Sequence, residues 1–326
     1  MKLTPVIFGT SCLGNLYKAI PMETKVAIAA EWFKAFEHPV IDSAGKYGAG
    51  FSLECIGKAL KALGKKNGDL TISVKLGWRR SRRLNPGEEP TFEPGAWKDL
   101  EYDAVQDISA RGIIACFDDA RELLGGDYDI QMVSVHDPDE FVASGGDIKD
   151  VVGAYQTLFR LKDDQEGVKS VGIGAKDWRI IRELWNRGIR FDWVMFACQP
   201  TLLVHPPELI SFVNELKAAG VTLIDSAVFN GGFLIGSDML DYRKADPEKD
   251  AAAFAFRERY LELCCRYGLD PAAPAVEYAY RLGFDAVALN TSSPKRILQN
   301  AAYANAKASE AFWRELGIWN HKTHEM

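Results

Sequence analysis

The sequence contains no long uninterrupted apolar run, and this absence argues against a membrane-spanning protein. No stretch approaches the ~18 consecutive apolar residues that a transmembrane helix needs. Of the 326 residues, 47% are hydrophobic and 26% are charged, as in ordinary globular proteins. The opening residues Met1–Pro5 are not followed by the apolar segment of a secretory signal. We therefore expect a cytoplasmic protein without a membrane partner.

Paired cysteines, clustered histidines and a basic excess are also missing. The six cysteines include no C-x-x-C pair, and the neighbours Cys264 and Cys265 are poorly placed for a disulfide, so we expect reduced thiols. No second histidine lies near His136 in the sequence, so no metal is expected. The net charge of −6 argues against a nucleic-acid partner. For the one basic run, Arg79 to Arg83, a solvated loop and a wall that steers an anion both stay open.

Short apolar runs alternate with longer amphipathic stretches about eight times. This alternation predicts a parallel sheet covered by helices, and eight repeats predict an α/β protein with one (β/α)8 (TIM) barrel domain over residues 1–326. An open doubly wound sheet would carry G-x-G-x-x-G after an early strand, and Gly9 and Gly14 lack that spacing. The predicted strands are Pro5–Phe8, Val40–Asp42, Leu70–Leu76, Ile130–Val135, Val168–Ile173, Trp193–Phe196, Val221–Ile224 and Ala286–Leu289.

Helices are predicted between these strands, and several end at a glycine, as helices often do. The clearest are Glu23–Phe36, Ser52–Leu63, Ser109–Leu124, Trp178–Asn186, Glu208–Ala219 and Ala251–Tyr267. Two long loops, Gly77–Gln106 and Gly232–Glu248, would lie on the face of the barrel where the strands end. The tail from residue 308 onward predicts a short helix containing Trp313 and Trp319, followed by a polar end.

Four ionisable residues lie at or just after the ends of three successive predicted strands. Asp42 ends the second strand, Tyr47 follows it in a glycine-bearing loop, Lys75 closes the third strand and His136 follows the fourth. Barrel enzymes keep their chemistry at these strand ends. Taken singly, each residue also has a structural explanation, such as a loop tyrosine or a surface lysine. Taken together, they favour a proton-transfer site on a rigid scaffold.

This set, with Asp42-x-Ala-x-x-Tyr47 followed by Lys75 and His136, resembles the aldo-keto reductases. The resemblance covers nearly the whole chain, from Gly9-Thr10-Ser11 to the stretch 290–300. It implies that Tyr47 is the general acid and base, and that the Lys75 ammonium lowers the tyrosine pKa from its usual ~10. Asp42 would hold Lys75, and His136 would hydrogen-bond the substrate oxygen.

The resemblance also implies a nicotinamide cofactor. In the family pattern Lys-Ser-x4-Arg-x2-Glu-Asn, Asn290 stands for the lysine, Thr291 for the serine and Gln299 for the glutamate. The lost lysine removes one charge that would hold a 2′-phosphate, while Arg296 and Lys295 remain, so NAD and NADP both stay open. A simple serine-capped helix also fits this stretch. The expected cofactor contacts are Gly9, Thr10, Gln199, Ser226, Ala227, Phe229, Gly231, Gly232, Asn290, Thr291, Ser292, Lys295, Arg296, Gln299 and Asn300.

Further details of the sequence resemble one branch of the family. Ser226 stands where a tyrosine commonly stacks on the nicotinamide, and this change, with the opening Phe8–Asn15, is similar to the aldose 1-dehydrogenases of L-fucose, L-galactose and D-threo-aldoses. We therefore predict oxidation of an aldose at C1 to the lactone. Tyr17, Trp78 and His205 are the expected substrate contacts, because aromatic faces with a few polar groups suit a sugar.

Three other functions remain as hypotheses. The first is an NADPH-dependent aldehyde or ketone reductase. The second is a non-catalytic nicotinamide-binding partner of a membrane protein, as in the potassium-channel β subunits. The third is an aldolase that forms a Schiff base at Lys75. In each enzymatic case the partner is a small molecule, and the protein is expected to be a monomer or a small homo-oligomer.

Overall fold

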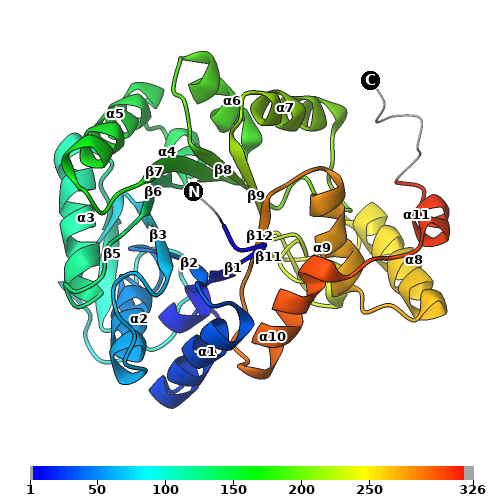
Figure 1. Cartoon of the computed structure of the whole chain (residues 1–326), viewed down its shortest axis with the longest axis horizontal. Helices are drawn as coiled ribbons and strands as arrows, with labels where there is room; N and C mark the ends of the chain where they lie inside the picture. Colours follow the sequence, from blue (N-terminus) through cyan, green and yellow to red (C-terminus); the bar gives the residue numbers. More distant parts are fainter. Residues whose placement is uncertain (1–2, 319–326) are drawn as a thin grey trace. The chain divides into compact units, whose positions relative to one another are not determined.

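The structure is a computed structural model, and it describes residues 3–318 (Figure 1). Eight parallel strands close into a barrel in the order β1-β12-β9-β8-β7-β6-β3-β2, which confirms the predicted (β/α)8 fold. The chain divides into two compact units. The first comprises the residues up to Met195 together with 288–301, and the second comprises residues 196–287 together with those from 302 onward. The two are described separately.

The first unit holds most of the strands and begins with β1. Its strands are β1 (Val6–Gly9), β2 (Val40–Ala44), β3 (Thr71–Leu76), β4 (Trp78–Arg83), β5 (Tyr102–Gln106), β6 (Met132–His136) and β7 (Ser170–Ala175), with β8 (Trp193–Ala197) continuing into the second unit. Its helices are η1 (Ser11–Gly14), α1 (Met22–Ala35), α2 (Phe51–Ala62), α3 (Ala110–Leu123), α4 (Pro138–Ala143), α5 (Ile148–Asp164), α6 (Trp178–Asn186) and α10 (Lys295–Ala302).

Strands β2, β3, β6 and β7 are buried along their whole length, as expected for parallel strands with helices outside them. Their register fixes which residues are neighbours. Asp42 lies opposite Gly9 on β1 and Ser73 on β3, and Ala44 lies opposite Lys75. The predicted strands have the right places, with ends that differ by at most two residues. Asp42 is inside β2 and is not its last residue.

Capping side chains explain where several helices of this unit begin. Ser109 accepts a hydrogen bond from the backbone N–H of Gly112 at the start of α3. Asp147 and Asp177 cap α5 and α6 in the same way. Each cap satisfies an N–H group that has no partner inside the helix.

The segment predicted as a long loop, Gly77–Gln106, begins and ends in an antiparallel pair of strands, β4 and β5. Sequence patterning missed this pair because its first strand is a run of arginines with no apolar alternation. Each arginine is paired with a carboxylate, which favours an ordered surface over a free anion-steering wall. The pairs are Arg79–Asp119, Arg80–Glu54, Arg82–Glu88 and Arg83–Glu101.

The second unit begins within β8 and contains the remaining elements. They are α7 (Pro207–Ala218), β9 (Thr222–Ser226), η2 (Phe233–Ile235), β10 (Met239–Leu240), β11 (Arg243–Lys244), α8 (Ala251–Tyr267), α9 (Ala272–Arg281), η3 (Tyr303–Asn305), α11 (Glu310–Leu316) and the first half of β12 (Ala286–Leu289), whose second half belongs to the first unit. The predicted loop 232–248 holds a small core of its own, formed by Phe233, Leu240 and Ala245. Among residues 3–318, no helix combines the length and the apolar character that crossing a bilayer requires.

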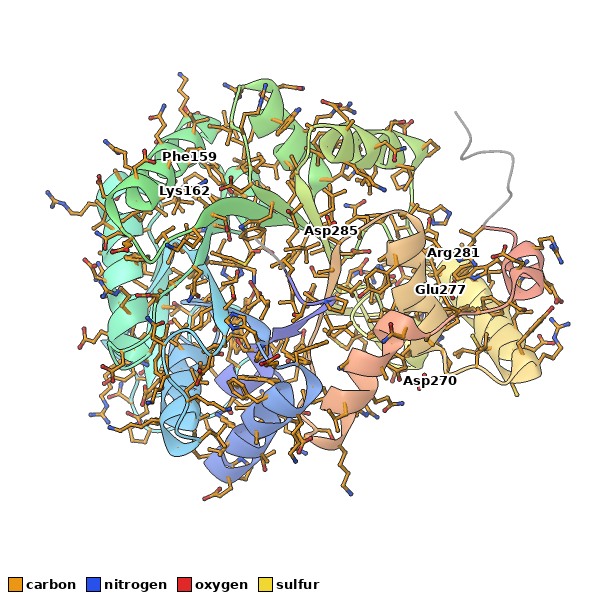
Figure 2. All side chains as sticks on the ribbon, viewed as in Figure 1. Phe159, Lys162, Asp270, Glu277, Arg281 and Asp285 are labelled. Atoms are coloured by element: carbon orange, nitrogen blue, oxygen red, sulfur yellow. The ribbon has the colours of Figure 1, made fainter. Side chains whose placement is uncertain are left out.

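A buried carboxylate ties the C-terminal segment to α9 (Figure 2). Glu277, 1% exposed, accepts a hydrogen bond from Arg281 Nε at 2.9 Å and from the backbone N–H of Ala308 at 2.6 Å. Arg281 also reaches Glu310 at 2.6 Å and lies over the ring of the buried Trp313, 4.7 Å from its centroid. The predicted short helix is present as α11, while Trp319 lies outside the described residues.

This arrangement predicts unequal costs for two glutamate substitutions. Glu277→Gln removes a buried charge beside Arg281, and we expect it to lower the free energy of unfolding by about 3 kcal/mol. Glu310→Gln, at an exposed position on the same arginine, should cost less than ~1 kcal/mol. Urea denaturation of both variants measures the difference. Equal losses would show that burial of Glu277 does not set the strength of the anchor.

Candidate active site

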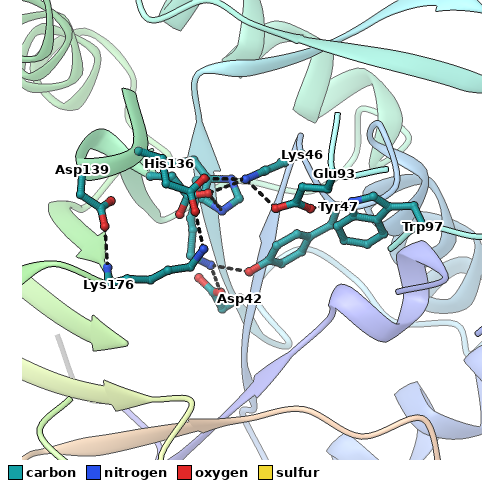
Figure 3. A network of polar contacts seen from close by, with 11 residues as sticks. Asp42, Lys46, Tyr47, Glu93, Trp97, His136, Asp139 and Lys176 are labelled. Atoms are coloured by element: carbon teal, nitrogen blue, oxygen red, sulfur yellow. Dashed lines mark hydrogen bonds and ion pairs between the residues drawn. The ribbon is translucent and has the colours of Figure 1, made fainter. Parts of the chain in front are cut away.

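The structure brings the four predicted residues together in the first unit (Figure 3). Asp42 lies in β2, Tyr47 in the turn after it, Lys75 near the end of β3, and His136 is the last residue of β6. Lys75 Nζ donates to Asp42 Oδ2 and lies 3.2 Å from the Tyr47 hydroxyl. The His136 ring meets the Tyr47 ring edge-on, with 5.5 Å between centroids. One ammonium therefore contacts both a carboxylate and a phenol.

Neighbouring groups fix this geometry. Asp42 Oδ1 accepts a hydrogen bond from Ser73 Oγ at 3.0 Å, so both of its oxygens are engaged on β3. A Cβ at Gly14 would lie 2.8 Å from the Tyr47 carbonyl group, so only glycine allows this approach to the tyrosine backbone. Thr10 donates its hydroxyl to the Asp42 carbonyl at 2.9 Å. The chain around Asp42 and Tyr47 is thus packed from both sides.

The electrostatics of the Tyr47–Lys75 pair differ from the simple expectation. Burial raises the pKa of Tyr47, the Lys75 ammonium lowers it only in part, and Asp42 raises it again, so the net shift is upward. The expectation of a lowered pKa took account of the Lys75 ammonium and left out the burial of Tyr47. For Lys75, burial lowers the pKa, but Asp42 and Tyr47 outweigh it and the net shift is also upward. In the protein alone, Lys75 is a cation and Tyr47 keeps its proton at neutral pH.

His136 is neutral at physiological pH. Burial lowers its pKa well below the usual 6.5, and the ammonium groups of Lys46 and Lys75 lower it further. Its Nδ1 has no hydrogen-bond partner within residues 3–318, and its Nε2 lies 3.6 Å from Asp137 Oδ2. A neutral imidazole can either donate or accept a hydrogen bond at a substrate oxygen.

A second group of charged residues beside the site was not predicted. Lys46 forms ion pairs with Asp137, Glu93 and Glu140, and Lys176 pairs with Glu140. Two sequence signals were available, because Lys46 immediately precedes Tyr47 and Asp137 immediately follows His136. Apolar periodicity does not predict where either side chain lies, so the ion pair between them is revealed only by the three-dimensional structure.

The expected cofactor residues of the first unit surround the start of α10. Asn290 Nδ2 donates to Ser11 Oγ at 2.9 Å, and a Cβ at Gly9 would lie 3.3 Å from Asn290 Cβ, so β1 and this segment are in close contact. Thr291 Oγ1 accepts from the Ser293 N–H, and Thr10 is buried beside Asp42. The exposed residues here are Asn290, Ser292, Lys295, Arg296 and Gln299, whereas Asn300 is buried.

Lys295 and Arg296 are exposed cations, and neither forms an ion pair with a carboxylate of the described chain. They lie in the first turn of α10, where the backbone N–H groups of Arg296 and Ile297 already donate to Ser293 and Pro294. The two side-chain cations are what this turn offers to a phosphate group. The residues present are therefore compatible with the phosphates of NAD or NADP.

The second unit holds the other expected cofactor residues. Ser226 ends β9, and its hydroxyl donates to the Phe196 carbonyl at 2.8 Å. Gln199 lies just after β8, and the remaining expected residues, from Ala227 through Phe229 to Gly232, form a tight turn. Ala227, Gly231 and Gly232 have positive φ angles of 52°, 73° and 93°.

The expected substrate residues lie in different surroundings. Tyr17 is 47% exposed, and its backbone N–H donates to Ala96 in the segment between β4 and β5. Trp78 and Trp97 pack in one cluster with Tyr47, and Trp97 is only 3% exposed, so it is mainly part of the core of that segment. His205, in the second unit, contacts the Thr201 carbonyl through Nδ1 at 2.9 Å and packs edge-on against Tyr278.

Comparison with known proteins identifies the family. Residues 5–319 match the aldo/keto reductase family, and the chain belongs to it. It is 26% identical to a pyridoxal 4-dehydrogenase from Microbacterium luteolum, over 97% of this chain and 94% of that protein. It is 24% identical to an L-galactose dehydrogenase from Arabidopsis thaliana, over 78% and 70% of the two chains. The structure of a glycerol dehydrogenase from Gluconobacter oxydans superposes with a TM-score of 0.71 at 16% identity, over 97% and 90% of the two chains.

The protein is therefore an oxidoreductase that uses NAD or NADP and acts on small molecules. Within residues 3–318, no group of three or more His, Cys, Asp and Glu side chains is arranged to hold a metal ion. All six cysteines are free, and only Cys265 is exposed.

The position of Asn290 predicts a change in cofactor preference. Asn290→Lys restores a cation next to the exposed pair Lys295 and Arg296, so we expect the ratio of kcat/KM for NADP over NAD to rise about tenfold. The matched control is Leu298→Lys, which adds the same charge at an exposed position of α10. Steady-state kinetics with both cofactors measure the ratio. An equal rise in the control would mean that added charge acts without regard to position.

Proposed function

We propose that this oxidoreductase oxidises an aldose at C1, in its cyclic hemiacetal form, to the lactone. The observation that carries the proposal is the contact of the Lys75 ammonium with both Asp42 and the Tyr47 hydroxyl, beside a neutral His136. A buried cation at 3.2 Å stabilises a phenolate more than a phenol, so Tyr47 can take up a proton as well as give one up.

The reaction divides between the protein and the cofactor. NAD(P)⁺ supplies the hydride acceptor, and C1 loses its hydrogen with the bonding electron pair. Tyr47 as phenolate takes the proton of the anomeric hydroxyl, and the electrons of that O–H bond complete the C=O bond of the lactone. Lys75, held by Asp42, stays protonated throughout. His136 hydrogen-bonds the same oxygen and keeps it oriented toward Tyr47.

The two sequence relatives support this substrate class. L-galactose is an aldose, and pyridoxal carries a hydroxymethyl group beside its aldehyde, so both compounds can close to a cyclic hemiacetal. The aromatic and charged surroundings of Tyr47 also suit a ligand with both C–H and O–H surfaces. We further propose that the protein acts in the cytoplasm without a membrane partner.

One observation favours a second candidate, an NADPH-dependent aldehyde or ketone reductase. The raised pKa of Tyr47 leaves the hydroxyl protonated in the protein alone, which suits proton donation to a carbonyl oxygen. By contrast, the raised pKa of Lys75 works against an aldolase, because a Schiff base requires a neutral amine.

Removing the Tyr47 hydroxyl tests the acid–base role. Tyr47→Phe should lower kcat by ~10²–10⁴-fold, because it removes the group that accepts the proton and leaves the ring in place. Cofactor affinity, followed by fluorescence titration with NADPH and NADH, should stay within about twofold of the wild-type value. Near-normal turnover in this variant would exclude Tyr47 as the acid–base group.

Substrate ranking tests the direction and the class. We expect a higher kcat/KM for L-fucose or L-galactose with oxidised cofactor than for benzaldehyde with reduced cofactor. The sugar offers hydroxyls to the charged groups near Tyr47, and the aromatic aldehyde offers none. Parallel assays of nicotinamide absorbance measure both values. The reverse ranking would support the reductase candidate.

A further inference from the structure

Lys46 is a buried lysine next to Tyr47 in the sequence, and carboxylates from three segments surround it. Its Nζ lies 2.7 Å from Asp137, which follows β6, and 2.8 Å from Glu93, between β4 and β5. It lies 3.1 Å from Glu140 in α4. Burial lowers the pKa of Lys46, but these carboxylates outweigh it and raise the pKa above its ordinary value. Lys46 is therefore a permanent cation beside the active site.

Through Asp137, the Lys46 ammonium acts on His136. Asp137 Oδ2 lies 2.7 Å from Lys46 Nζ and 3.6 Å from His136 Nε2, so the carboxylate facing the imidazole is the one that Lys46 holds. The ionisable groups that face His136 are Lys46, Lys75, Lys176, Asp137, Glu140 and Tyr47. Removing one cation from this set leaves two carboxylates and two ammonium groups.

Through Glu93, the same ammonium reaches the aromatic neighbours of Tyr47. Glu93 Oε1 binds Lys46, and Glu93 Oε2 accepts a hydrogen bond from Trp97 Nε1 at 2.7 Å. The Trp97 ring lies 6.0 Å from the Tyr47 ring, centroid to centroid. Lys46 Nζ also lies 5.0 Å from the centroid of a Trp78 ring. The ion pair between Lys46 and Glu93 therefore holds the segment between β4 and β5 beside Tyr47.

Backbone conformation supports a specific role for these contacts. Asp137 and Glu93 both have positive φ angles, 50° and 46°. Such a conformation is unfavourable for a non-glycine residue and persists where the surrounding contacts enforce it. The carboxylates of both residues pair with the same ammonium, that of Lys46.

We propose that Lys46 is a positioning residue for the reaction, whose ammonium orients His136 through Asp137 and Trp97 through Glu93. It acts on the reacting groups through these two neighbours. The proposal rests on the roles proposed for Tyr47 and His136. On this proposal, the ion pairs of Lys46 with Asp137 and Glu93 contribute to the rate of the reaction as well as to the stability of the fold.

The first test reads the charge state of His136 directly. Histidine ring NMR signals are followed over about pH 5–8 in the wild type and in Lys46→Gln, and His136→Gln identifies the signal of interest. In the wild type, we expect this signal not to titrate above pH 6. In Lys46→Gln, the pKa should rise by at least one unit, because the ring loses a nearby cation and Asp137 loses the ammonium that pairs with it, while Glu140 keeps Lys176. An unchanged titration would overturn the proposal.

The second test is kinetic. Lys46→Gln should lower kcat about 10- to 100-fold, because misplaced groups lose their alignment with the substrate. Its kcat should also fall further as pH drops from 8 to 6, as His136 takes up a proton. Lys46→Arg, which keeps the charge, should recover most of the rate. The control Lys58→Gln removes an exposed lysine from an ion pair with Glu54 and should behave as the wild type.

A third variant guards against a folding defect. Glu93→Gln keeps Lys46 paired with Asp137 and Glu140, and its side chain is 36% exposed, so we expect a folded protein. It should raise KM or lower kcat several-fold without moving the His136 titration. A variant that loses only thermal stability would overturn the proposal. If the wild type oxidises no aldose, the proposed function fails, and the NMR titration still decides the role of Lys46.

Discussion

The buried ion pair between Lys75 and Asp42 is the interaction on which the site depends. Two charges are removed from water inside the barrel, and their attraction offsets that cost only because the geometry is tight and Ser73 satisfies the second carboxylate oxygen. The register of β2 against β3 pairs Asp42 with Ser73 and places Lys75 two residues further along β3. The result is an ammonium fixed 3.2 Å from the Tyr47 hydroxyl. Strand pairing therefore determines where this ammonium meets the phenol.

A second layer of charge surrounds this pair. Lys46 and Lys176 pair with Asp137, Glu140 and Glu93, so the positive and negative charges of this group nearly cancel. In the low-dielectric interior of a protein, such ion pairs are strong when both partners are present, and the removal of one partner is costly. Burial, together with the ammonium groups of Lys46, Lys75 and Lys176, lowers the pKa of His136 and keeps it neutral, and burial keeps Tyr47 protonated. The protein alone is thus poised to donate a proton, and oxidation requires a phenolate stabilised by Lys75.

The barrel and the four-residue cluster follow from the sequence because their signals are local. Apolar runs mark the strands, and Asp42, Lys75 and His136 lie near strand ends, which share one face of a barrel. Two features do not follow. The first is the β4–β5 pair, because its first strand is a run of arginines without apolar alternation, and most of the carboxylates that pair with them are far away in the sequence. The net direction of the Tyr47 pKa depends on burial, which no sequence pattern reports.

The central proposal is that Tyr47 takes the proton of a sugar's anomeric hydroxyl while C1 gives its hydrogen, as hydride, to the nicotinamide. Oxidation of C1-deuterated L-galactose, followed by mass spectrometry of the cofactor and the product, tests it most directly. The account predicts deuterium on the reduced nicotinamide, an unlabelled lactone and a lower kcat/KM than for the unlabelled sugar. Deuterium retained in the oxidised sugar would contradict it, because the hydride would then have left another carbon.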